Sequence, residues 1–153
     1  EDKMLPIYEK AGELGLITLL HSGVDIGYFE PVHCTPERLS HVLDAFGAPV
    51  VAAHMGAFEQ WDDVERYLVG KEVYFDTAFT YSCMPKGRAL RIVRNHGYDK
   101  ILMGSDMPWS STVHAVRFIE SFELPAEQEA AILGGNAARL LGLKPLCSKN
   151  ARE

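Results

Sequence analysis

Short apolar runs alternate along this chain with segments in which apolar residues recur every three or four positions. The runs are typical of buried parallel strands, and the longer spacing is typical of amphipathic helices. Four strands are predicted in this way, over residues 16–21, 49–54, 72–76 and 100–105. Helical spacing precedes the first strand, separates each strand from the next and follows the last. The alternation predicts an α/β fold on a parallel sheet with right-handed crossovers.

Capping and turn residues set the predicted helix boundaries. Gly15 and Gly47 end the first two helices, and Thr35 with Pro36 begins the second. Further helices are expected over residues 60–69, 85–96, 111–122, 125–133 and 136–142. Four strands suit either a small open sheet or half of an eight-stranded barrel, and the hydrophobic period does not choose between them.

Three strand ends carry side chains suited to chemistry. The first strand ends at His21 and the second at His54, each followed within two residues by glycine, and Asp106 follows the fourth strand. Such positions meet at the carboxyl edge of a parallel sheet. Each residue alone has an ordinary explanation, a structural histidine or a helix cap. Together they form the imidazole and carboxylate donor set of catalytic zinc, manganese or non-haem iron.

Composition narrows the class of protein. The chain has 153 residues, 47% of them hydrophobic, and a formal net charge of −6. One domain with a sizeable core is expected, without a basic stripe for nucleic acid or anionic membranes and without an apolar run of ~20 residues. The scattered Cys34, Cys83 and Cys147 show no disulfide or C-x-x-C pattern, which favours a cytoplasmic protein.

Five motifs, in order, resemble the C-terminal half of an amidohydrolase of the amidohydrolase-2 type. They are Leu20-His21-Ser22-Gly23, Ala53-His54-Met55-Gly56, Val73-Tyr74-Phe75-Asp76-Thr77, Gly104-Ser105-Asp106-Met107-Pro108-Trp109 and Gly135-Asn136-Ala137-Ala138-Arg139-Leu140-Leu141. The resemblance implies a metal-dependent (β/α)8 barrel in which His21, His54 and Asp106 end strands five, six and eight. Residues 1–145 would form this half-barrel segment, and 146–153 a flexible tail. The H-x-H or E-x-H pair of the family's first strand does not occur in this sequence, so we expect an incomplete metal site.

The resemblance implies an enzyme that acts on a small molecule. The leading interpretation is hydrolysis of a C–N or C–O bond by a metal-activated water, with zinc as the expected metal and manganese or iron as alternatives. Non-oxidative decarboxylation fits the same residues. A third hypothesis is a non-catalytic half-barrel that needs a partner chain. Its exposed sheet edges and apolar inner face would favour pairing with a second copy, so we expect a homo-oligomer.

The resemblance implies a role for each candidate site residue. His21 is the expected metal ligand, and Asp106 a ligand that also takes a proton from water. His54 would steady charge on the substrate, or become a ligand where two metals bind. His33 and Trp109 are candidate substrate contacts. The alternatives are that His33 is a solvated loop residue and that Trp109 only fills space at the rim.

Other polar residues receive structural interpretations. Asp76 is expected to hydrogen-bond at the rim or to serve the fold alone. His41, His96 and His114 fall on predicted helices and are expected to be solvated.

Overall fold

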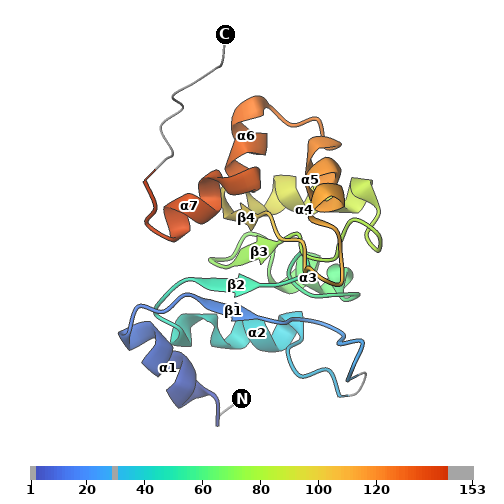
Figure 1. Cartoon of the computed structure of the whole chain (residues 1–153). Helices are drawn as coiled ribbons and strands as arrows, with labels where there is room; N and C mark the ends of the chain where they lie inside the picture. The colour runs from blue at the N-terminus through green and yellow to red at the C-terminus, as the bar shows by residue number, and fades with distance from the viewer. Residues whose placement is uncertain (1–2, 29–30, 145–153) are drawn as a thin grey trace.

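A single parallel sheet organises the computed structural model, which describes residues 3–28 and 31–144. Its strands are β1 (Thr18–Leu20), β2 (Val50–Ala52), β3 (Tyr74–Asp76) and β4 (Ile101–Leu102). They lie in the order β1-β2-β3-β4, and every neighbouring pair is parallel (Figure 1). The predicted α/β fold with four parallel strands is therefore confirmed.

The strands are shorter than predicted, most clearly β4. The predicted strand ran over 100–105, but the ladder ends at Leu102. Beyond it the backbone bonds elsewhere: the N–H of Met103 donates to the carbonyl of Ile132 at 3.0 Å, and that of Gly104 to Thr77 Oγ1 at 3.1 Å. The chain therefore leaves the sheet early and carries Asp106 out on a loop.

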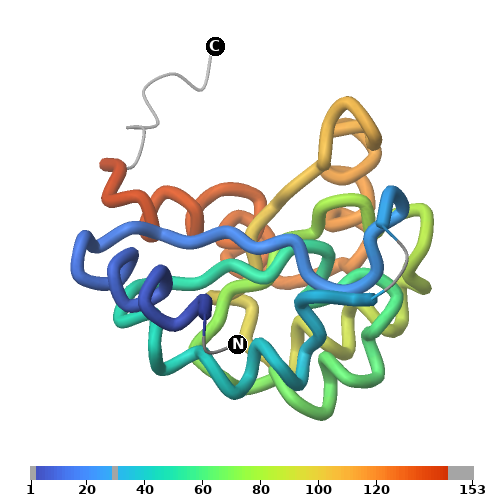
Figure 2. Tube along the Cα trace, turned by 90° about the horizontal axis from the view of Figure 1, so that it is seen from below, coloured from blue at the N-terminus to red at the C-terminus, as the bar shows by residue number. Residues whose placement is uncertain are grey.

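The helices follow the predicted order. They are α1 (Leu5–Glu13), α2 (Pro36–Val42), α3 (Trp61–Tyr67), α4 (Lys86–His96), α5 (Thr112–Glu120), α6 (Ala126–Ala130) and α7 (Asn136–Leu140), with short turns η1 (Leu43–Ala45), η2 (Tyr98–Lys100) and η3 (Ala131–Gly135). Thr35 caps α2 as predicted, because its side chain accepts the N–H of Arg38 at 3.3 Å. In Figure 2, α1, α2 and α3 lie on one side of the strands.

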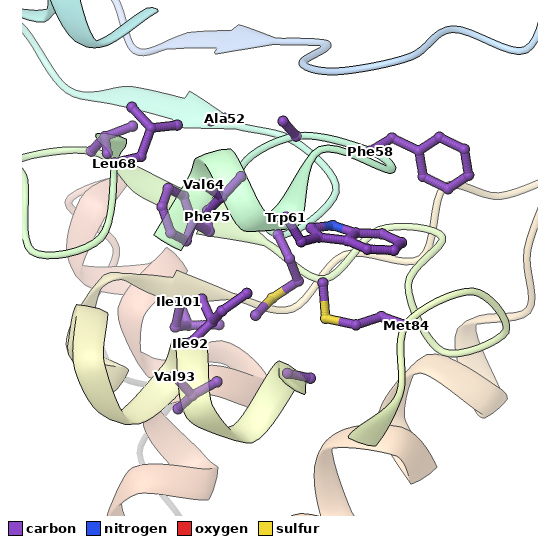
Figure 3. Close-up of a cluster of buried hydrophobic side chains, with 14 of the residues drawn as sticks. Ala52, Phe58, Trp61, Val64, Leu68, Phe75, Met84, Ile92, Val93 and Ile101 are labelled. Atoms are coloured by element: carbon purple, nitrogen blue, oxygen red, sulfur yellow. The ribbon is translucent and has the colours of Figure 1, made fainter. Parts of the chain in front are cut away.

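The main core lies between that side of the sheet and its helices. Ala52, Phe75 and Ile101 are register partners on successive strands, and each is fully buried. They meet Val64 of α3 and Ile92 of α4 (Figure 3). Burying side chains of this size stabilises a fold by about 1.5–3 kcal/mol each.

The opposite face of the sheet is less evenly covered. Val51 of β2 is buried, but its register partner Leu19 on β1 is 63% exposed, and Ile17 just before β1 is also exposed. Because β1 and β4 end the strand order, each has one edge without a strand partner among the described residues.

His96 corrects one prediction, since it is buried rather than solvated. Its Nε2 donates to the carbonyl of Val73 at 2.8 Å, its Nδ1 accepts the N–H of Gly70 at 3.1 Å, and its ring stacks on Phe75 at 3.9 Å. Burial lowers the pKa of His96 to about 4. His96 lies on the buried face of α4 because it continues the helical spacing of Ala89, Ile92 and Val93, which are all buried. His41 and His114 are exposed, as predicted.

None of the helices in the described ranges combines the length and apolarity that a bilayer-spanning helix needs. Cys34 and Cys83 are free thiols. Cys147 and the predicted tail at 146–153 lie outside the described residues.

Candidate active site

A pocket of about 550 Å³ lies beyond the carboxyl ends of the strands. The strand arrows in Figure 1 all point to this side, where the loops after β1 and β4 also lie. The pocket is lined by His21, Val24, Asp25, Ile26, Gly27, His54, Phe58, Phe79, Asp106 and Trp109. Four of the five predicted site residues thus share one pocket. The fifth, His33, is exposed on the β1–α2 loop and does not line it.

The two histidines face each other directly. His54 Nε2 lies 3.1 Å from His21 Nδ1, and their ring centroids are 4.9 Å apart. The outer nitrogens each point at a backbone carbonyl: His54 Nδ1 lies 3.0 Å from the oxygen of Ala78, and His21 Nε2 lies 3.2 Å from that of Val24.

These contacts define where the protons lie. A carbonyl oxygen only accepts hydrogen bonds, so both outer nitrogens of the pair donate. In neutral imidazoles the inner nitrogens, His54 Nε2 and His21 Nδ1, then both present lone pairs to each other. Two lone pairs at this distance repel unless a proton or a metal cation is shared between them. The pair is therefore arranged to hold positive charge inside the pocket.

Asp106 brings a carboxylate to the same pocket. It is half-buried, and within the described residues its side chain has no hydrogen-bond partner, so both oxygens remain available. Its negative charge is close enough to add to the rise in the pKa of Asp76. The main cause of that rise is the burial of Asp76 itself, which disfavours the carboxylate.

The side chain of Asp76 anchors the backbone of His54 by a hydrogen bond. Its Oδ1 accepts the backbone N–H of His54 at 2.9 Å and that of Ala78 at 3.0 Å. One buried side chain therefore holds the backbone N–H of His54 and that of Ala78, the residue whose carbonyl accepts the Nδ1–H of His54. Trp61, buried at the start of α3, adds a third anchor by donating Nε1–H to the carbonyl of His54 at 3.1 Å.

Backbone strain is concentrated around the pocket. His54, Phe79 and Asp106 all line it and all have positive φ, at 62°, 56° and 63°. This left-handed conformation costs roughly 1–2 kcal/mol for a residue with a Cβ. Strain of this kind persists where the surrounding structure holds it, and it gathers at functional sites.

Gly23 allows the two histidine loops to meet. The N–H of Phe58 donates to Ser22 at 2.8 Å, and the N–H of Val24 donates to Phe58 at 3.0 Å. A Cβ at Gly23 would lie 2.2 Å from the carbonyl oxygen of Phe58, and Gly23 also has φ +87°. The glycine after His21 therefore serves a close approach of backbones that holds His21 beside His54.

The described residues supply part of a metal site. Two nitrogens that both bind one ion at ~2.1 Å can lie up to ~4.2 Å apart, so the histidine pair at 3.1 Å fits a shared ion. Asp106 adds an oxygen donor in the same pocket. Across residues 3–28 and 31–144, however, no three histidine, cysteine, aspartate or glutamate side chains are gathered closely enough to hold an ion.

Sequence reasoning missed several residues of this pocket. Phe58, Phe79 and Asp25 line it, and none of the three was singled out from the sequence. Asp76 was expected to hydrogen-bond at the rim or to serve the fold alone, and its bonds to the N–H groups of His54 and Ala78 confirm the hydrogen bonding. Phe79 had no signal, because a phenylalanine after an apolar strand is indistinguishable from a core residue.

The comparisons with known proteins identify the family of this chain. The model of the Amidohydrolase family matches residues 1–143. The chain belongs to the amidohydrolase family. Members of this family include enzymes that hydrolyse and enzymes that decarboxylate. No curated protein matches the chain.

Solved structures match the fold at low sequence identity. An uncharacterised TIM-barrel protein from Bordetella bronchiseptica has a TM-score of 0.70 at 20% identity, over 93% of this chain and 51% of its own. A dihydroxybenzoic acid decarboxylase from Polaromonas, with bound manganese and the inhibitor 2-nitroresorcinol, has a TM-score of 0.65 at 15% identity, over 93% and 54%. An amidohydrolase from Burkholderia multivorans with bound zinc has a TM-score of 0.59 at 15% identity, over 94% and 58%.

The chain spans little more than half the length of these structures. Its sheet of four parallel strands therefore corresponds to half of a TIM-type barrel. The predicted family and the predicted half-barrel fold are both confirmed.

Proposed function

We propose that this chain carries the histidine and aspartate part of a metal-dependent hydrolase site for a small molecule. The observation that supports this most is the His21–His54 pair, whose inner nitrogens face each other at 3.1 Å while both outer nitrogens are held by carbonyls. The pair is built to hold a cation, and the pocket around it is large enough for a small substrate.

His21 Nδ1, His54 Nε2 and a carboxylate oxygen of Asp106 would hold the ion. A divalent metal polarises a substrate carbonyl and lowers the pKa of water toward ~7. Asp106 takes the proton from the attacking water and passes it to the leaving group. The Ala78 carbonyl fixes the Nδ1 proton of His54, so His54 Nε2 stays free for the ion or for charge on the substrate. Phe58 and Phe79 line the same pocket with apolar rings.

Zinc and manganese are both supported as the metal. The donors are two imidazoles and a carboxylate, which suit either ion. Zinc and manganese are each present in a structure that matches this fold. We favour zinc because two of the three donors are nitrogens.

Decarboxylation is the second candidate, favoured by the match to a decarboxylase. The same residues serve it, with Asp106 delivering a proton to the carbon that loses CO₂ rather than taking one from water. Purified chain given a panel of amides, lactones and aromatic acids distinguishes the reactions, because only decarboxylation releases CO₂ without consuming water.

Titration calorimetry with zinc and with manganese tests the metal proposal. His21→Ala and Asp106→Asn should each weaken zinc binding at least tenfold, because the first removes a nitrogen donor and the second removes the negative charge of the carboxylate. His41→Ala, which removes an exposed histidine of α2 far from the pocket, is the matched control and should leave binding unchanged. Zinc binding that is unaffected by His21→Ala and Asp106→Asn would reject the proposal.

A further inference from the structure

Phe79 lies in a turn whose conformation disfavours it. The N–H of Thr80 donates to the carbonyl of Thr77 at 3.3 Å, which closes a turn over residues 77–80, and Phe79 is its third residue. Its φ is 56°, in the left-handed region where turns of this kind prefer glycine or asparagine. A bulky residue there is a genuine outlier, so its ring must supply something that glycine would not.

The ring of Phe79 forms a wall of the pocket. Phe79 and Phe58 both line the pocket, and their ring centroids lie 5.8 Å apart. The ring of Phe58 in turn lies 5.9 Å from that of His54. The pocket thus joins an aromatic surface directly to the histidine pair.

The same turn also serves the catalytic histidine. The carbonyl of Ala78, the residue before Phe79, takes the Nδ1 proton of His54, and the N–H of Ala78 is anchored by Asp76. The backbone that orients His54 therefore also fixes where the ring of Phe79 stands. Both phenylalanine rings line the same pocket as His54.

We propose that Phe79 determines substrate specificity, by forming with Phe58 an aromatic wall for substrates with a planar aromatic body. The reactive polar group of such a substrate faces His21, His54 and Asp106, while its ring packs on the phenylalanines. This inference rests on the proposed function for its account of the polar end. An offset or edge-to-face aromatic contact strengthens binding by about two- to twelve-fold over area burial alone.

Benzoate and cyclohexanecarboxylate are suitable probes, because they share charge and ring size and differ in planarity. Their dissociation constants can be followed by tryptophan fluorescence, since Trp109 lines the pocket. We expect the unchanged protein to prefer benzoate by about two- to twelve-fold. Phe79→Leu keeps apolar bulk without the ring, and Phe79→Asn suits the left-handed turn. Both should reduce the preference to near unity.

Phe118→Leu is the matched control. Phe118 is a half-buried aromatic residue of α5 that packs on Phe122 and does not line the pocket, so its loss should leave the preference intact. Circular dichroism melts confirm that each variant is folded. A benzoate preference that survives in both Phe79 variants would overturn the proposal, as would the absence of a preference in the unchanged protein or a failure of both probes to bind at millimolar concentration.

Running the titrations with and without zinc separates this inference from the proposed function. An aromatic preference that depends on Phe79 but is found in a protein that binds no metal would contradict the proposed function alone. Metal binding that depends on His21, together with a preference indifferent to Phe79, would contradict the specificity role alone.

Discussion

Replacing His96 with glutamine should remove a pH dependence from the stability of this fold. His96 is held neutral by burial, with a pKa near 4 in the folded chain against an ordinary value of 6.5. Below pH 6.5 the unfolded chain takes up a proton that the folded chain refuses, so stability is lost as the pH falls from 6.5 toward 4. Above pH 6.5 the residue is neutral in both states and has no such effect.

The size of the effect follows from the two pKa values. Between about pH 7.5 and about pH 5 the unfolded state gains about 2 kcal/mol relative to the folded state from this group alone. The full difference, reached below pH 4, is about 3 kcal/mol. His96→Gln keeps a donor for Val73 and an acceptor for Gly70 but does not titrate.

Urea unfolding at a series of pH values measures this directly. The difference in unfolding free energy between the unchanged protein and H96Q should shrink by about 2 kcal/mol between about pH 7.5 and about pH 5. Other titrating groups, including Asp76 with its raised pKa, cancel in that difference. His41→Gln, at an exposed site, is the control and should show no such change. Parallel curves for the unchanged protein and H96Q would contradict the lowered pKa of His96.

Two further predictions concern the anchor of His54 and the exposed sheet face. Asp76→Ala leaves the N–H groups of His54 and Ala78 without their acceptor, so chemical denaturation should show a loss of unfolding free energy of about 2–4 kcal/mol. The amide oxygen of D76N still accepts hydrogen bonds, so this variant should recover most of the loss. Equal losses in the two variants would argue against the anchoring role of Asp76. Light scattering should find the chain as a dimer or larger, because Leu19 and Ile17 are exposed beside the unpaired edge of β1, and a stable monomer at tens of micromolar would contradict this.

The number and positions of the strands could be predicted because each apolar run was short, continuous and followed by a turn. The positions of His21, His54 and Asp106 came from the same signal, since the end of a parallel strand has a fixed place in the fold. Strand length was overestimated because an apolar residue such as Met103 looks the same whether it continues a ladder or packs against a neighbouring turn.

The details that shape the pocket were beyond the sequence because they depend on contacts between distant segments. The burial of His96, which lies outside the pocket, could by contrast have been predicted, because its spacing with Ala89 and Ile92 places it on the buried face of α4. The left-handed backbone of Phe79 had no local signal, because glycine or asparagine would ordinarily mark such a position. Asp25 and Phe58 line the pocket because the loops after β1 and β2 are joined by backbone hydrogen bonds.

The most direct test of the metal proposal is a crystal structure of the chain grown with zinc, recorded at the zinc absorption edge. We expect one anomalous peak in the pocket, within ~2.1 Å of His21 Nδ1 and His54 Nε2, with Asp106 facing it. A pocket without anomalous signal, in crystals where zinc binds only at exposed histidines such as His41 or His114, would contradict it.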